Sequence, residues 1–507
     1  MALAGGSKPP KLVLCVIDAM APEMLERAVA AGVAPVLATL IERGRYVPDC
    51  VAAFPSVTPV CAASIVTGLA QDAHRVPGMN WYDREEARYV EYGSSFRSAQ
   101  RFGIGRQLTD TVYNMNRVHL AAETLTLFES LDDAEVRTAG TTYLMYRGRH
   151  RHEPQRDTAL TRVASALMRH SVMGPRELFY ADIFASQRTG CRSGLGMPGV
   201  RDRHSGCVSS YMVEHDLFDF LLLSLPDNDW HSHKRGPDAQ LQSLAQADLQ
   251  LARVCEAAGG VDAFLAEHAV IAMADHSQAP VTDTIALQDE LADLGVLGPA
   301  RGAEREDAHI AVCPSQRAAM VYALQESERD AMRASVVTRA LAIEGVEHVI
   351  WLARDAHDRP SEGIIGGRGR RELRFRPGGE LRDPRGARWS LEGSLETIGG
   401  HVEDGSLHTP DFPDVLARVW AALTCPNSGE VLLSCVPGYE FLDWGRQAHV
   451  GGGSHGSLHA SDSLGALVFC GLELPERDPG QWAIRDVAPL VLEHFGLRPQ
   501  AAGAPAV

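Results

Sequence analysis

Short apolar runs recur along the chain, separated by segments with helical periodicity. The runs cover residues 11–18, 47–53, 217–226, 269–274, 431–436 and 464–470. An uninterrupted apolar run is typical of a parallel strand that is covered on both faces. Apolar residues at helical spacing fill residues 22–44, 239–257 and 487–495. The pattern predicts an α/β fold, with a central, mostly parallel sheet flanked by helices.

Glycine, proline and arginine change this pattern in several places. Gly32 and Pro35 interrupt the first helical segment, so one helix and two helices are equal alternatives there. Residues 84–210 are rich in arginine, tyrosine and methionine and poor in apolar runs, which predicts an insertion or cap that returns to the site. Residues 285–400 predict a second insertion or a small subdomain. The chain has no internal repeat and no long low-complexity linker, so residues 1–507 are expected to form a single domain.

The segment from Phe54 to Gly68 is the strongest candidate for a chemical role. Thr58 stands where an N-cap is expected, Pro59 suits the first helical position, and Gly68 ends the apolar stretch. The start of a helix presents unpaired N–H groups and the positive end of the helix dipole, which favours phosphate and other anions. Two interpretations follow: Thr58 only caps its helix, or its hydroxyl acts at an anion site.

Candidate metal ligands follow the apolar runs and a later glycine-rich segment. The carboxyl ends of parallel strands face one side of a sheet, so side chains hundreds of residues apart can meet there. Carboxylates and imidazoles in this mixture suit zinc, with manganese as the second choice. The candidates are Asp18, one Asp and one His from an expected loop over residues 227–233, Asp275, His276 and His455. With Thr58 they number seven, and because one tetrahedral zinc needs four ligands, the set predicts a pair of metal ions.

Composition limits the class of protein. The 507 residues carry a formal net charge of -17, with 45% hydrophobic and 22% charged residues. This acidic balance is a poor match to nucleic-acid polymers and anionic membranes, because both bind basic faces. The ten cysteines lack CxxC spacing, which predicts reduced, buried thiols, with a few disulfides as the alternative. We recognise neither a secretory signal nor an apolar run long enough to span a membrane, so the expected location is cytoplasmic.

These segments together resemble the nucleotide pyrophosphatase/phosphodiesterase family of the alkaline phosphatase superfamily. The matching motifs are Pro55-Ser56-Val57-Thr58, Ser64-Ile65-Val66-Thr67-Gly68, Asp275-His276 and Ser454-His455-Gly456. The resemblance implies an alkaline-phosphatase-like fold and a phosphoric ester hydrolase with two zinc ions. By resemblance, one zinc would be held by Asp18, Thr58, Asp275 and His276, and the other by an Asp-x-x-x-His pair and His455.

The resemblance also implies two roles in the reaction. Thr58 would be the nucleophile, and Asn80 would contact a phosphoryl oxygen. The chain departs from the family's pattern at Ala19, where glycine is usual, and at Cys61 and Ala62, which are often Asn-His. Ala19 is still small and is expected to be tolerated, whereas Cys61 and Ala62 bear on substrate preference more than on the metal site.

The Asp-x-x-x-His pair can be read in two ways. Asp227 with His231 and Asp229 with His233 both have the required spacing of four. The pattern of the resembled family has a proline before the Asp, which favours Asp227, and a Gly-Pro three residues after the His, which favours His233. The Gly-Pro leads into a helix, so its position should be geometrically stricter than that of the upstream proline. Asp229 and His233 are therefore the preferred ligands.

The expected activity is that of a phosphodiesterase or nucleotide pyrophosphatase acting on a small, phosphorylated, nucleotide-like substrate. The alternative on the same site is a phosphomonoesterase or phosphonate hydrolase. A metal-binding protein without catalysis is the third hypothesis, and the full ligand set with a hydroxyl argues against it. The sequence does not indicate the oligomeric state.

Overall fold

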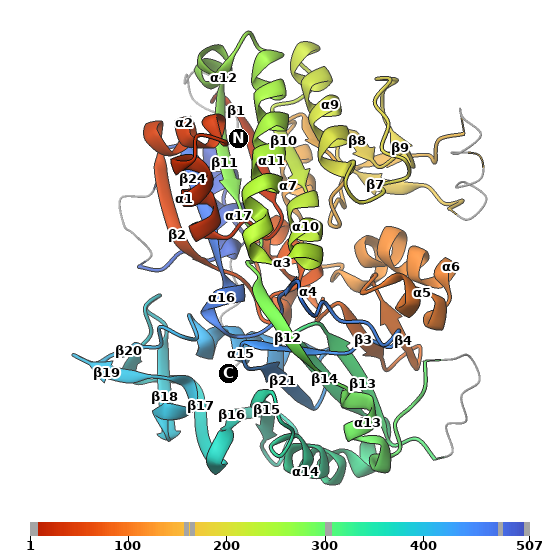
Figure 1. Cartoon of the computed structure of the whole chain (residues 1–507), viewed down its shortest axis with the longest axis vertical. Helices are drawn as coiled ribbons and strands as arrows, with labels where there is room; N and C mark the ends of the chain where they lie inside the picture. Colours follow the sequence, from red (N-terminus) through yellow and green to blue (C-terminus); the bar gives the residue numbers. More distant parts are fainter. Residues whose placement is uncertain (1–8, 157–161, 163–167, 300–306, 475–479, 501–507) are drawn as a thin grey trace.

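An eight-stranded sheet is the centre of the upper half of the molecule in Figure 1, a computed structural model that describes residues 9–156, 162, 168–299, 307–474 and 480–500. Its strands lie in the order β2 (Arg45–Val51), β24 (Leu464–Cys470), β11 (His268–Met273), β1 (Lys11–Ile17), β10 (Phe220–Leu225), β5 (Thr138–Gly140), β8 (Glu177–Tyr180) and β9 (Phe184–Ala185). The central strands β11, β1, β10, β5 and β8 are parallel, and the outer strands β2, β24 and β9 are antiparallel to their neighbours. The predicted mostly parallel sheet is therefore confirmed.

Helices cover both faces of this sheet, because the central strands are mostly apolar and present apolar side chains to both sides. Successive side chains of β1 alternate between two cores, as the two-residue period of a strand requires. One core contains α1 (Pro22–Ala30), α2 (Pro35–Arg43), α9 (Arg201–Glu214), α11 (Gln240–Glu256) and α12 (Val261–Glu267). The other contains α3 (Thr58–Thr67), α7 (Leu127–Asp132), α15 (Val415–Thr424) and α17 (Val487–His494). The result is a three-layer arrangement with the sheet in the middle.

A second, mainly antiparallel sheet of nine strands occupies the lower half of Figure 1. It contains β13 (Ile310–Ser315), β14 (Ala318–Ala323), β21 (Val431–Cys435), β15 (Val346–Arg354), β16 (Pro360–Gly367), β17 (Arg371–Arg382), β18 (Arg388–Gly393), β19 (His401–Glu403) and β20 (Ser406–His408). The helix α14 (Arg329–Ala340) packs on β14, β15 and β21. The boundaries predicted for the two inserted regions stay predictions.

A small three-stranded sheet brings two distant parts of the chain together. Its strands are β22 (Gly438–Phe441), β12 (Ala279–Ile285) and β23 (Gly453–Ser454). In its register Ala279 pairs with Ser454, so the residues just after His276 lie beside the residues just before His455. This pairing places two of the predicted metal-ligand segments at one point.

Residues 84–210 contain more regular structure than their composition predicts. The hairpin of β3 (Asn80–Asp83) and β4 (Arg88–Glu91) leads into α5 (Phe96–Phe102), α6 (Ile104–Thr109) and a π-helix over Asp110–His119. Two short strands of the same region, β5 and β8, extend the central sheet beyond β10. A further hairpin pairs β6 (His150–His152) with β7 (Val172–Gly174).

Three local expectations are refined by the structure. The first helical segment is two helices, α1 and α2, bent by 105° at the Gly32–Pro35 break. The prediction of a loop after β10 is wrong, because these residues form the helix α10 (Asp227–Arg235). Its acidic first turn and basic last turn complement the helix dipole. The residue at the N-cap of α3 is Val57, and Thr58 is the first helical residue.

The cysteine prediction holds for eight residues and is wrong for two. Eight cysteines are free and buried. Cys191 and Cys207 form a disulfide, with their Cα atoms 5.9 Å apart. Cys207 lies on α9, and the irregular chain before this helix folds back so that Cys191 meets it, which the spacing of 16 residues did not reveal.

In the described part of the chain, no single helix combines the length and apolar character that crossing a membrane requires. The bent pair α1 and α2 meets that criterion only jointly, by length and composition. Both helices contact the antiparallel strand β24, and α11 packs against both of them.

A buried ion pair joins the second sheet to the glycine-rich segment. The Arg317 and Asp462 side chains are both fully buried, with Nη1 and Oδ1 2.8 Å apart. Arg317 also donates to the carbonyls of Val436 and Tyr439, and its backbone N–H donates to the carbonyl of His455 at 2.9 Å. Asp462 in turn accepts hydrogen bonds from the backbone and hydroxyl of Ser457. Through these bonds the two paired residues hold the His455 carbonyl and the Ser457 backbone in place.

We expect Arg317→Met to lower the free energy of unfolding by about 3–5 kcal/mol, because it leaves the Asp462 carboxylate buried without its cation. Denaturant titration of the full chain measures this. The control is Arg333→Met, which removes a pair between the half-buried Arg333 and the exposed Asp330 and should cost less than about 1 kcal/mol. Equal effects of the two substitutions would show that the buried pair does not stabilise this junction.

Candidate active site

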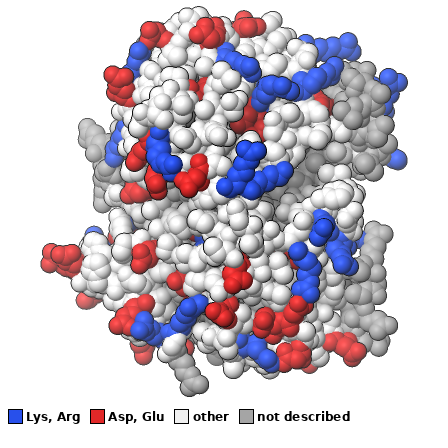
Figure 2. Space-filling view, in the orientation of Figure 1, with Lys and Arg blue, Asp and Glu red and all other residues white. Residues whose placement is uncertain are grey.

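A cavity of about 890 Å³ opens at the carboxyl ends of the central strands. Six of the predicted metal ligands line it: Asp18, Thr58, Asp229, His233, Asp275 and His455. Much of its outer wall comes from residues between 92 and 108 and from Thr142, Tyr143, Leu144 and Tyr180. The space-filling view shows a hollow near the middle of the molecule, bordered by basic side chains (Figure 2).

The first group of candidate metal ligands comes from two neighbouring strand ends. Asp18 follows β1, and Asp275 and His276 follow β11. Their ligand atoms lie within 4.8 Å of one another, and His276 Nε2 is 3.6 Å from Asp18 Oδ1 and 3.5 Å from Asp275 Oδ2. The other oxygen of Asp275 accepts the backbone N–H groups of Ala19 and His276, which fixes the carboxylate and leaves Oδ2 free.

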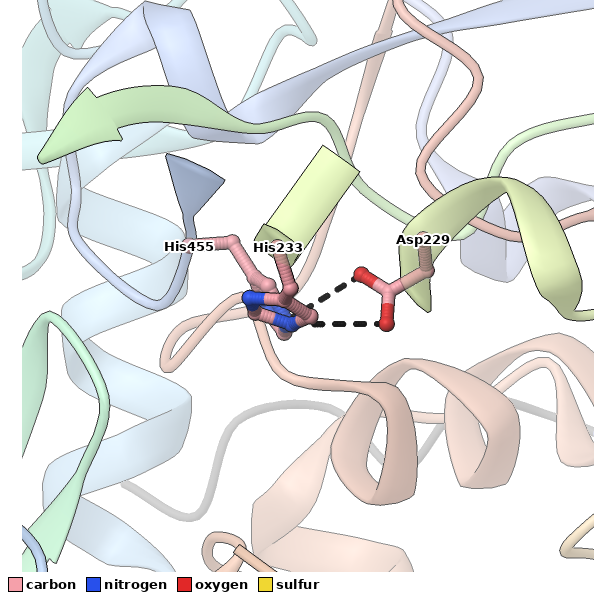
Figure 3. Close-up of side chains that lie close together, drawn as sticks. All are labelled: Asp229, His233 and His455. Carbon is pink, nitrogen blue, oxygen red and sulfur yellow. Dashed lines mark ion pairs between the residues drawn. The ribbon is translucent and has the colours of Figure 1, made fainter. Parts of the chain in front are cut away.

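The second group lies on α10 and beside β23. Asp229 and His233 are one turn apart on the same face of the helix, and His455 follows β23 (Figure 3). Their ligand atoms also lie within 4.8 Å of one another. Asp229 Oδ2 is 3.3 Å from His233 Nε2, and Asp229 Oδ1 is 3.6 Å from His455 Nε2.

The two groups and Thr58 meet at one place. The rings of His276 and His455 stack with their centroids 3.7 Å apart, which puts one group beside the other. Thr58 Oγ1 lies 3.3 Å from His276 Nε2, and Thr58 is the first residue of α3. From Phe54 to Thr67, Thr58 is the one residue that is not buried, so its hydroxyl reaches the cavity.

The three histidines are held in the orientation that metal ligands need. Each directs its Nδ1 at a backbone carbonyl: His233 at Gly453, His455 at Ser56, and His276 at Ser277, at 2.8, 2.7 and 3.1 Å. An N–H on Nδ1 leaves the lone pair on Nε2. All three Nε2 atoms point toward the carboxylates of their group.

Burial and crowding set the electrostatics of the site. Burial raises the pKa of the Asp18 carboxyl well above its usual range, and the nearby carboxylates of Asp275 and Asp229 raise it further. Burial lowers the pKa of His455, and the adjacent imidazole of His276 adds to this. Burial opposes ionisation of Asp229, but the facing imidazoles of His233 and His455 outweigh it and hold the pKa of Asp229 below its usual range.

These observations fit a pair of divalent cations. Asp18 Oδ1 and Asp275 Oδ2 are buried and have no hydrogen-bond partner among the described residues. A buried carboxylate oxygen without a donor is costly unless a cation neutralises it. The mixture of carboxylate oxygen and imidazole nitrogen in both groups suits zinc or manganese.

The alternative pair, Asp227 and His231, does not reach either group. Asp227 accepts the backbone N–H of Gly199 at 2.8 Å and that of Asp202 at 3.1 Å, and it pairs with Arg201 Nε at 2.9 Å. His231 packs edge-on against Trp230. Because a helix turns about 100° per residue, a pair shifted by two residues faces about 200° away.

Asn80, predicted to contact a phosphoryl oxygen, is buried at the start of β3. Its Nδ2 donates to the carbonyl of Val90 at 2.9 Å, and its Oδ1 is buried without a partner among the described residues. It is not among the described residues that line the cavity. The predicted role of Asn80 stays a prediction.

Ser56 is a functional residue that the sequence analysis did not single out. Its backbone N–H donates to the carbonyl of Gly456 and its carbonyl accepts from His455 Nδ1. Its hydroxyl donates to the carbonyl of Ser457 and accepts from the N–H of Gly456, both at 3.0 Å. These four bonds join the Thr58 segment to the His455 segment. No feature of the sequence distinguishes Ser56 from the neighbouring hydroxyl residues Thr58 and Ser64.

Glu440 is a second residue that the sequence did not reveal. This buried carboxylate on β22 accepts hydrogen bonds from His449 Nδ1 and from the hydroxyl of Ser454, at 2.8 and 2.7 Å. The His449 ring in turn lies over the ring of His233, with centroids 4.0 Å apart. Glu440 therefore braces both histidine segments of the second group.

Ala19, the departure from the usual glycine, has a positive φ of 58°. A residue with a side chain is strained in this region, whereas glycine is not. The strained turn brings the Ala19 N–H to Asp275 Oδ1, so the substitution keeps the contact that orients this carboxylate.

Comparison with known proteins shows the family of this chain. Among solved structures, the phosphonoacetate hydrolase from Sinorhizobium meliloti 1021, in complex with phosphonoformate, is similar with a TM-score of 0.53 and 16% sequence identity, over 97% of this chain and 98% of that chain. This similarity confirms the alkaline-phosphatase-like fold. A comparison with curated proteins finds no match. A family model described as type I phosphodiesterase / nucleotide pyrophosphatase matches residues 12–355, more than half of the chain. The chain therefore belongs to the type I phosphodiesterase/nucleotide pyrophosphatase family.

Proposed function

We propose that this protein is a phosphodiesterase or nucleotide pyrophosphatase that uses Thr58 as nucleophile and two zinc ions as cofactors. The observation that carries the proposal is the position of the Thr58 hydroxyl, 3.3 Å from His276 Nε2 and in the cavity that both ligand groups border.

In this proposal Asp18, Asp275, His276 and Thr58 hold one zinc, and Asp229, His233 and His455 hold the other. When bound, the metal pair supplies positive charge that lowers the pKa of a coordinated hydroxyl and stabilises charge on phosphoryl oxygens. Thr58 is at the first turn of α3, where the helix dipole favours the same anionic charge.

The reaction divides into two displacements at phosphorus. Thr58 Oγ1 forms a bond to phosphorus while the bond to the leaving alcohol breaks, and the alcohol departs with a proton. Water then displaces the phosphoryl group from Thr58, which regains its hydroxyl proton. Covalent catalysis of this kind replaces one difficult step with two easier ones.

Substrate preference distinguishes this proposal from a phosphomonoesterase or phosphonate hydrolase on the same site. The test is a panel of 4-nitrophenyl phosphate monoesters, 4-nitrophenyl phosphodiesters and phosphonoacetate, assayed with the zinc-loaded protein. The proposal expects the diesters to have the highest kcat/KM. A preference for the monoester or for phosphonoacetate would favour the alternative, and no turnover of any member would favour a binding protein.

We expect Thr58→Ala to lower kcat by about 10³-fold or more, because no other side chain supplies the attacking oxygen. Thr58→Ser keeps a hydroxyl and is the matched control, with an expected loss of about tenfold. Steady-state kinetics with a 4-nitrophenyl diester measure both. Activity of Thr58→Ala within tenfold of the unchanged protein would mean that Thr58 is not the nucleophile.

We expect His233→Ala to lower the zinc content from about two ions per chain to about one, because it removes one of three protein ligands from the second group. His231→Ala is the matched control on the same helix and should keep both ions. Elemental analysis after gel filtration measures the content. Loss of zinc from the His231 variant alone would assign the site to Asp227 and His231 instead.

A further inference from the structure

Lys234 places a cation in the wall of the same cavity. It follows His233 on α10, and it lines the cavity with Trp230. Its Nζ lies 4.1 Å from the centroid of the Trp230 ring. A cation over an indole ring is held in position by the ring quadrupole while it keeps its full charge.

The other basic side chain of the cavity wall is already neutralised. Arg201 pairs with Asp227 at 2.9 Å and donates a second bond to the carbonyl of Pro226. Lys234, in contrast, has no carboxylate partner among the described residues. Of the Lys and Arg residues that line the cavity, Lys234 is therefore the one whose charge remains available to a ligand.

The Trp230 ring, over which Lys234 Nζ lies, is held in position by its neighbours. Gly199 lies so close to the far part of the indole that an added Cβ would meet Trp230 at 3.4 Å. The N–H of Gly199 is bonded to Asp227, which sits on the first turn of α10. Asp227 thus fastens the 199–202 segment to the helix that carries both Trp230 and Lys234, and the cation is held on the cavity side.

We propose that Lys234 binds a second anionic group of the substrate, so that the preferred substrates are phosphoesters that carry a carboxylate or a further phosphoryl group beside the reacting phosphorus. This inference rests on the proposed function. Lys234 adjoins His233 in sequence, and a substrate bound at the ligand groups lies in the cavity that Lys234 also lines. The three cavity carboxylates Asp18, Asp229 and Asp275 belong to the ligand groups, which leaves no acidic lining residue to repel a second anion at Lys234.

The test compares two substrates that differ by one charge. They are propyl 4-nitrophenyl phosphate and 2-carboxyethyl 4-nitrophenyl phosphate, and a diphosphate diester with the same aryl group serves as the phosphoryl counterpart. We expect Lys234→Met to lower kcat/KM for the two doubly charged substrates by about tenfold and that for the propyl ester by less than about threefold. Whichever doubly charged substrate loses more identifies the preferred second group.

Arg235→Met is the matched control, because Arg235 is the next basic residue, is exposed and does not line the cavity. It should leave the ratio between charged and uncharged substrates unchanged. An equal loss on all substrates with Lys234→Met, or no loss on the charged ones, would overturn the inference while leaving the proposed function intact.

A binding measurement keeps the inference testable if none of these esters is hydrolysed, which would count against the proposed function alone. Calorimetric titration of the zinc-loaded protein compares ethylphosphonate with 2-carboxyethylphosphonate. We expect the carboxylate to tighten binding by about tenfold in the unchanged protein and in Arg235→Met, but not in Lys234→Met. Equal affinities for the two phosphonates in the unchanged protein would overturn the inference.

Discussion

The site depends on a small hydrogen-bonded junction between two loops that are 400 residues apart in the sequence. Ser56 makes four hydrogen bonds with the segment His455–Ser457, through its N–H, its carbonyl and both functions of its hydroxyl. One of these bonds fixes the His455 ring, and Ser56 is two residues from Thr58. The junction therefore sets the nucleophile candidate and a metal-ligand candidate relative to each other before any ligand is bound.

The second sheet supports this junction from outside. The turn between β13 and β14 carries Arg317, whose buried charge is matched by Asp462 just beyond the junction. Gly456 has a φ of +118°, and an added Cβ would lie 2.9 Å from the carbonyl oxygen of Ser315, so only glycine fits against this turn. The sheet that contributes no candidate metal ligand thus determines where His455 lies.

The sequence predicted those residues of the candidate site that follow the ends of central strands. Asp18 and Asp275-His276 could be found because each follows an apolar run, and the carboxyl ends of parallel strands share one edge. The helical state of residues 227–235 was missed because Asp, Asn and Ser at the start also suit a loop. Asp229 was already preferred over Asp227 because of the Gly-Pro after His233, and the helix adds a physical reason, since it turns the two carboxylates to different sides. The partners of Ser56, Asp227 and Glu440 could not be predicted, because each bond joins residues with no periodic or spacing relation.

The central claim is that the two ligand groups hold a pair of metal ions next to Thr58. Diffraction data from crystals of the zinc-loaded protein, collected on both sides of the zinc absorption edge, test it most directly. The account predicts two anomalous peaks about 4 Å apart, one among Asp18, Asp275 and His276 and the other among Asp229, His233 and His455. A single peak, or a peak away from both groups, would contradict it.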